Sequence, residues 1–124
     1  MTTRGIVNIS IGGLDFELVP SFENLDRLET VLNRPCYDFL AKDLVVQKYK
    51  VGDIVRCILA CGSSRVKRYP EWWSFAGIGE QVLIERGKAG DLSVAIATFI
   101  GNAISAGSET DIKTVGATDE DVKK

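Results

Sequence analysis

Residues 5–19, GIVNISIGGLDFELV, decide the fold, because they predict a β-hairpin whose pairing can be written down from the sequence. A two-residue turn at Gly12-Gly13 places apolar side chains opposite one another on one face, since strand side chains alternate between faces. The polar residues fall on the other face, and a slip of one residue would mix the two faces. The predicted apolar pairs are Ile11 with Leu14, Ile9 with Phe16, and Val7 with Leu18; the polar pairs are Ser10 with Asp15, and Asn8 with Glu17.

Beyond Pro20 the apolar residues recur with helical spacing instead of strand spacing. Ser21 is suited to cap the first helix, Pro35 to open the second as its first residue, and Asp53 to cap the third. We predict the fold class α+β, with an N-terminal β-hairpin packed on a bundle of four to five short α-helices. The helices are expected at about residues 21–33, 35–41, 53–61, 74–86 and 91–105.

Residues 1–106 form a single globular domain in this prediction, and residues 107–124 form a flexible polar tail. Residues 43–52 could form a short strand or an extended loop, of which the loop is preferred, and residues 63–73 are predicted as a connector. Each of the first four helices has apolar residues that are expected to face inward. They are Leu25, Leu28 and Leu32 in the first helix, Tyr37 and Leu40 in the second, Ile54, Ile58 and Cys61 in the third, and Phe75, Ile78 and Val82 in the fourth.

Two of the predicted helices have unusual compositions. The fourth contains Gly77 and Gly79, each of which costs up to about 1 kcal/mol relative to alanine, so close packing against a neighbour would justify them. The fifth is apolar on nearly all sides, which is typical of a central core helix or of a self-association surface. Exposing Ile96, Phe99 and Ile100 would be costly, which favours the core, while homo-oligomerisation stays open.

The composition is that of an ordinary globular domain. The chain has 124 residues, of which 45% are hydrophobic and 26% charged, so it can bury a core. Its net charge of −2 gives no general attraction to nucleic acid or to anionic membranes. No segment has the roughly 20 consecutive apolar residues that span a bilayer, and the first residues lack the apolar stretch of a signal peptide. We therefore expect a cytoplasmic protein without a membrane partner.

The residue types present restrict the chemistry. The chain has no histidine, so the commonest general acid–base residue is missing, and it contains neither of the usual glycine-rich phosphate loops. Cys36, Cys57 and Cys61 are expected to be reduced thiols. Cys57 and Cys61 could share a helix face in a metal site, but three thiolates without histidine fall short of a usual zinc set, which favours small buried hydrophobes. We predict no enzyme, no metal and no cofactor.

Basic and aromatic residues alternate in the connector, SSRVKRYPEWW at residues 63–73. Such a pattern can bind single-stranded nucleic acid, but Glu71 and the acidic net charge disfavour this reading. Tryptophan, tyrosine and arginine are also favoured anchors of protein interfaces. The plainest interpretation is one tryptophan packed inward, the other partly exposed, and a solvated loop. The candidate partner-binding residues are Arg65, Lys67, Arg68, Tyr69, Trp72 and Trp73.

Taken together, the pieces of this chain resemble a family of tailed-phage and gene-transfer-agent proteins. The pieces are, in order, GIVNISIGGLDFELVPSFENLDRLETVLNRP at residues 5–35, VGDIVRCILACG at residues 51–62, a helix ending in IERG, and the apolar fifth helix. Members of this family were first described as tail tube proteins and are now viewed as tail assembly chaperones. The resemblance runs from Arg4 to Ala106, and residues 5–35 are its most specific part.

The resemblance implies binding without catalysis. Such proteins hold the long, helical tape measure protein soluble in the host bacterial cell while the tail tube assembles around it, and they are absent from the finished particle. It implies the tape measure protein as partner, with the tail tube protein as a further candidate. In many phages a longer second product arises by ribosomal frameshifting near the end of the gene. The client could add a strand to the hairpin edge or lay a helix in a groove, and both modes stay open.

Two other functions stay open at this point. A structural tail (tube) component would need extensive β-sheet to stack into rings, and this chain predicts one hairpin. A small nucleic-acid-binding regulator would use the basic and aromatic connector.

Overall fold

The N-terminal hairpin forms as predicted. In the computed structural model, which describes the backbone of residues 5–115 and the side chains of residues 5–105, strand β1 spans Val7–Ile11 and strand β2 spans Leu14–Leu18. The strands pair antiparallel in the predicted register, with Ile11 opposite Leu14 and Val7 opposite Leu18. Gly12 and Gly13 form the turn with φ of 60° and 78°, values that glycine adopts without a steric penalty.

A third strand, β3 (Gly62–Ser64), extends the hairpin to a three-stranded antiparallel sheet in the order β1-β2-β3. It pairs with β2, with Glu17 opposite Ser63. The prediction placed Ser63 and Ser64 in a connector, because three small residues carry no apolar alternation.

The remaining elements are helical, which confirms the α+β fold class. Ser21 caps the first helix as predicted, since its Oγ accepts a hydrogen bond from the Asn24 N–H at 3.2 Å. The first helix ends at Asn33, whose left-handed conformation is typical of a helix terminus. The helices are α1 (Phe22–Leu32), α2 (Cys36–Phe39), the π-helix η1 (Leu40–Leu44), α3 (Val51–Cys61), α4 (Phe75–Ile84) and α5 (Lys88–Val115).

Three predicted helix starts were wrong, those of the second and third helices by one or two residues and that of the fifth by three, since α5 begins at Lys88 and not at residue 91. Lys50, and not Asp53, precedes α3, so Asp53 lies in the first turn, where a carboxylate is favourable beside the helix dipole and where it pairs with Arg56 at 2.9 Å. Pro35 is the residue before α2 and not its first residue.

The predicted tail also begins too early. Helix α5 starts at Lys88 and continues past Ser105 to Val115, so residues 107–115 are helical where the sequence predicted a tail. No proline follows Pro70 to stop the helix, and Gly107 alone does not end it. The rest of the predicted tail, residues 116–124, lies outside the described residues.

The loop predicted at residues 43–52 begins later than expected, because α2 continues into η1. Arg34 holds this segment in place. Its guanidinium donates to Asp38 at 2.7 Å and to Asp43 at 2.9 Å, and it lies over the Phe39 ring. Hydrogen bonds from the neighbouring cations Lys42 and Arg34 lower the pKa of the Asp38 carboxyl. This bidentate pairing across nine residues of sequence is a tertiary feature that local periodicity does not reveal.

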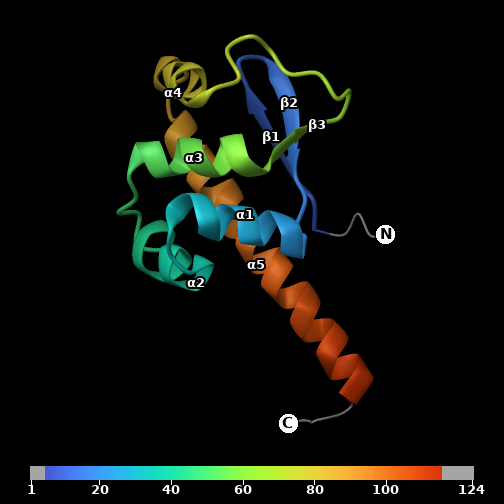
Figure 1. The fold of residues 1–124 in the computed structure, drawn as a ribbon. Helices are drawn as coiled ribbons and strands as arrows, with labels where there is room; N and C mark the ends of the chain where they lie inside the picture. Colours follow the sequence, from blue (N-terminus) through green and yellow to red (C-terminus); the bar gives the residue numbers. More distant parts are fainter. Residues whose placement is uncertain (1–4, 116–124) are drawn as a thin grey trace.

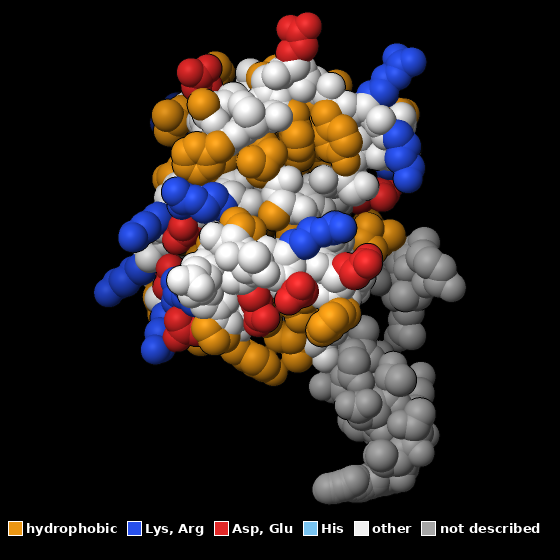
Figure 2. All heavy atoms as spheres, viewed as in Figure 1, with side chains coloured by type: hydrophobic (Ala, Val, Ile, Leu, Met, Phe, Trp, Pro, Cys, Tyr) orange, Lys and Arg blue, Asp and Glu red, His pale blue; other side chains and the backbone are white. Residues whose placement is uncertain are grey.

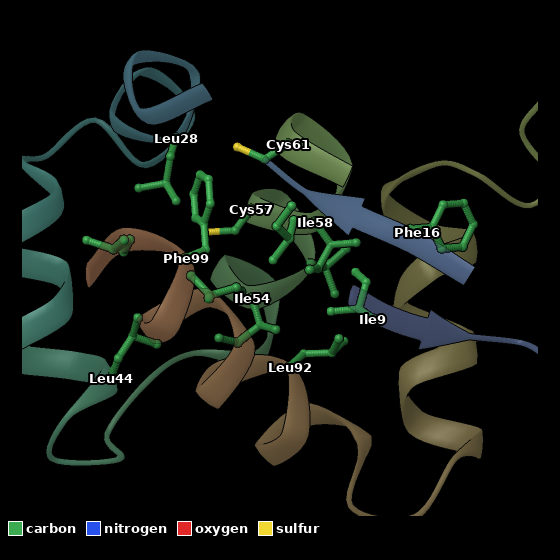
Figure 3. Close-up of a cluster of buried hydrophobic side chains, with 14 of the residues drawn as sticks. Ile9, Phe16, Leu28, Leu44, Ile54, Cys57, Ile58, Cys61, Leu92 and Phe99 are labelled. Carbon is green, nitrogen blue, oxygen red and sulfur yellow. The ribbon is translucent and has the colours of Figure 1, made fainter. Parts of the chain in front are cut away.

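The core lies between the sheet, α3 and the first half of α5. Figure 3 shows Phe99 of α5 pointing toward Leu28 of α1 and Cys57 of α3, with Ile54 and Ile58 nearby. The large residues expected on α5 are buried, which confirms its place in the core. Leu28, Ile54, Ile58, Cys61, Ile78 and Val82 are buried as predicted, and Leu25, Leu32 and Leu40 are partly buried against the core.

Two of the inward-facing residues were predicted wrongly. Tyr37 is 62% exposed, because the short helix α2 turns Cys36 and Phe39 inward instead. Phe75 is 45% exposed at the start of α4, where the Arg56 guanidinium lies 4.9 Å from its ring centroid and covers part of it.

Helix α5 passes behind α3 and α1 and extends beyond the rest of the molecule (Figure 1). The sheet and α4 lie at the opposite end (Figure 1). Among the described residues, no helix combines the length and apolar character needed to cross a bilayer.

Candidate partner-binding groove

The connector between β3 and α4, residues 65–74, arches past the turn of the hairpin (Figure 1). It leaves the sheet in a turn in which the Lys67 N–H donates to the Ser64 carbonyl at 3.1 Å. Lys67 adopts a left-handed conformation with φ of 60° at the tip of this turn. The connector then returns to Ser74, whose Oγ caps α4 by accepting from the Gly77 N–H.

An aromatic cluster holds the connector against the sheet. The rings of Phe16 and Trp73 stack with centroids 4.5 Å apart, and Tyr69 lies 5.2 Å from Trp73. Trp72 lies 6.1 Å from Trp73 and covers the hairpin turn, where a Cβ added to Gly12 would meet its ring at 2.9 Å. Both tryptophans are half-buried and pack against the core, Trp73 by stacking on the buried Phe16. They fix the connector, and their faces are largely used within the molecule.

An open groove of about 500 Å³ lies between the turn end of β2 and the connector. Its apolar side chains include Leu14, Val66 and Tyr69, which are 44%, 73% and 48% exposed. Figure 2 shows hydrophobic side chains gathered over α4 and the connector, with Lys and Arg side chains at the margin nearest β3. The residues that line the groove are Gly13, Leu14, Asp15, Phe16, Ser64, Arg65, Val66, Arg68, Tyr69 and Pro70.

The rim of the groove is basic. Arg65 donates from Nε to the Glu17 carboxylate at 2.6 Å and from a terminal nitrogen to Asn8 at 3.4 Å, so it lies along the polar face of the sheet. Lys67 and Arg68 are exposed and form no ion pair with another described residue. Asp15 is the one carboxylate of the groove lining. The groove therefore offers an apolar floor beside a net positive charge.

A second hollow, of about 590 Å³, lies on the other side of Tyr69 and Trp73, between the N-terminus of α1 and the end of α3. Two of its polar side chains, Asn24 and Arg27, are already paired with each other. The Asn24 amide donates to the Val19 carbonyl at 2.9 Å and accepts from Arg27 at 2.9 Å. This hollow is lined mainly by polar surface, so it offers a partner less apolar contact than the groove.

The three cysteines are free thiols and are buried. Burial raises the pKa of Cys61 to about 11, and burial followed by the neighbouring Cys61 and Asp53 also raises the pKa of Cys57. Burial and the nearby Glu29 carboxylate raise the pKa of Cys36. Within the part of the chain that the structure describes, no three His, Cys, Asp or Glu side chains are grouped as a metal site would require. The cysteines thus act as small core residues.

Because the cysteine thiols are buried, we expect them to react slowly with thiol reagents in the native protein. Ellman's reagent should leave Cys57 and Cys61 unmodified in native buffer at pH 8 and should titrate all three thiols after denaturation in urea. Because the folded-state pKa of Cys61 lies above its ordinary value of 9.0, its contribution to stability is complete below pH 9 and is lost as the pH rises toward 11. The free energy of unfolding should decline less steeply over this range in a Cys61→Ala variant. Rapid labelling of native Cys61 would contradict the buried placement.

The structure brings three of the six candidate residues into the groove, namely Arg65, Arg68 and Tyr69. Lys67 lies beside it at the turn, whereas Trp72 and Trp73 support the connector from behind. Sequence reasoning missed Leu14, Val66 and Pro70 as groove residues. Val66 is a single apolar residue between Arg65 and Lys67, which indicates a binding surface only weakly. Leu14 belongs to the predicted apolar face of the hairpin, and its position there does not predict its exposure.

Comparisons with known proteins find no match, whether with protein-family models, with curated proteins or with solved structures.

Proposed function

We propose that this protein is a tail assembly chaperone that binds the tape measure protein during tail morphogenesis. It acts by binding and not by catalysis, and it needs no cofactor. The proposal starts from the resemblance of residues 4–106 to that family, which rests on the order of the hairpin, the NRP break and the helices in this sequence.

One observation supports this proposal above the others, which is the exposed apolar groove beside the hairpin turn. Binding sites for partner groups are commonly concave surfaces in which apolar side chains stand beside a few polar ones. Val66, at 73% exposure, and Leu14, at 44%, would be protected from water by a bound polypeptide. A chaperone that keeps a helical client soluble needs such a surface.

The small sheet favours the chaperone over a structural tube component. Within residues 5–115 the sheet has three strands, the third only three residues long, while the helices are the larger part. Ring-stacking tube subunits need extensive sheet, and the edge of β1 is partly covered here, since Lys88 donates to the Ser10 carbonyl at 2.6 Å.

Co-expression tests the proposal. The tape measure protein encoded in the same gene cluster should be recovered in the soluble fraction in about tenfold greater yield when this chain is present than with an empty vector, because its apolar helices are then covered. The two proteins should co-purify. Mass spectrometry of purified particles should not detect this chain. An unchanged soluble yield, or the chain present in particles in the amount of a tube subunit, would overturn the proposal.

A further inference from the structure

We propose that the groove between the turn end of β2 and the connector binds an acidic amphipathic helix of a partner polypeptide. The inference deepens the proposed function and rests on it in one respect, since the tape measure protein is taken as the source of the helix. The chemistry of the occupant follows from the groove itself.

The charge of the groove selects the partner. Arg65, Lys67 and Arg68 follow one another within four residues of chain, and Asp15 is the only acidic side chain of the lining. Glu17 already neutralises Arg65 at 2.6 Å, which leaves Lys67 and Arg68 for a partner. Exposed cations at the rim of an apolar patch fit a segment whose apolar residues are flanked by Asp or Glu.

The sheet edges favour a helix over an added strand. Beside β1, side chains of α5 occupy two backbone carbonyls: Lys88 donates to that of Ser10, and Asn102 donates at 2.8 Å to that of Gly5, two residues before the strand. On the other side, β3 pairs over three residues and then turns away at Lys67. An added strand would compete with these side chains beside β1 and would find an edge of only three residues at β3. A helix needs only the apolar floor and its rim, and its residues at i, i+3 and i+4 can enter the groove together.

The aromatic residues favour a protein over nucleic acid. Single-stranded nucleic acid is bound by aromatic faces open to stacking. Trp73 stacks on Phe16 and packs at a tilt against Tyr69, and Trp72 lies against Trp73 and the hairpin turn. Tyr69 alone lines the groove with an exposed portion. The aromatic faces on which successive bases would stack are therefore largely covered by contacts within the molecule.

Four variants test whether binding takes place at the groove or elsewhere on the surface. Val66→Asp places a charge on the apolar floor, and Arg68→Glu reverses the rim. Val94→Asp is the matched control, because Val94 is 63% exposed on α5 away from the groove, and Arg86→Glu is the matched charge control on an exposed arginine. All four positions are exposed, so the fold should be retained, and circular dichroism and thermal unfolding check this.

The first measurement uses designed peptides, so that it does not depend on the tape measure protein. A fluorescein-labelled helix with leucines at i, i+3, i+4 and i+7 and glutamates elsewhere should bind, whereas the same helix with lysines should bind at least about tenfold more weakly. Val66→Asp and Arg68→Glu should each weaken binding of the acidic peptide by about tenfold, and the two controls should change it by less than about twofold. Equal binding of both peptides, or equal loss in the controls, would overturn the inference. Groove-dependent binding of a labelled oligonucleotide in preference to the acidic peptide would also overturn it.

The second measurement repeats the co-expression with each variant. Loss of tape measure solubility in Val66→Asp and Arg68→Glu, with retention in the controls, supports the inference. If all four variants keep the client soluble, the chaperone function stands and the groove is not its site. If the unaltered chain gives no solubility gain while the acidic peptide still binds the groove, the proposed function fails and the groove assignment stands with another partner. A change of oligomeric state confined to Val66→Asp would show that a second copy occupies the groove and would overturn the inference.

Discussion

Replacing Phe99 by alanine is expected to lower the free energy of unfolding by about 3–5 kcal/mol, the range for a phenylalanine removed from a packed core. Phe99 is fully buried and lies where α5 meets α1 and α3. The truncation would leave a cavity lined by Leu28, Cys57 and their neighbours, which rigid elements on three sides cannot close. Because small domains have only about 5–15 kcal/mol of stability, the variant should be near its folding limit.

Val94→Ala is the control for this change on the same helix. Val94 is 63% exposed, so its truncation should alter the free energy of unfolding by no more than about 0.5 kcal/mol. Urea unfolding followed by far-ultraviolet circular dichroism gives both values, and sedimentation velocity reports the oligomeric state. A Phe99→Ala variant that unfolds like the unaltered protein but changes its assembly would show that α5 serves self-association instead of the core. If Phe99→Ala does not fold, Phe99→Leu should still fold with an intermediate loss.

The hairpin could be predicted in full detail because everything that determines it is local. The apolar alternation of both strands and the glycine turn all lie within residues 5–19, and they agree on one register. The helix cap at Ser21 is local in the same sense. The boundaries that were missed depend on distant contacts. Arg34 stabilises η1 by reaching Asp43, and no periodicity in residues 40–44 announces a π-helix.

The candidate groove could be predicted only in part, for the same reason. The basic and aromatic residues of the connector stand together in the sequence and were recognised there. Leu14 and Val66 lie 52 positions apart by their numbers and meet at the groove only because β3 pairs with β2 and Trp73 stacks on Phe16. These contacts join segments far apart in the chain. The sequence therefore indicated the connector as one wall of the groove, and it did not indicate that the turn end of β2 forms the other wall.

The two glycines of α4 should respond to alanine in opposite directions. A Cβ added to Gly77 would clash with the Trp72 carbonyl oxygen and would lie 2.7 Å from the carbonyl carbon. These are backbone atoms, and the connector that carries them is held by the aromatic cluster, so α4 and the connector must separate. We expect Gly77→Ala to lower the free energy of unfolding by about 3 kcal/mol, at the upper end of the usual range for overpacking.

Gly79→Ala is the matched control, because it makes the same substitution in the same helix. The nearest atom to its added Cβ is Val55 Cγ2 at 4.0 Å, an ordinary contact. Alanine is the better helix former by up to about 1 kcal/mol, so this variant should be more stable than the unaltered protein. Urea unfolding followed by the fluorescence of Trp72 and Trp73 reports directly on the connector, and Gly77→Ala should also shift the native emission. Equal effects of the two substitutions would mean that the connector does not pack on α4 at Gly77. The groove, whose wall that same connector forms, would then lose its structural support.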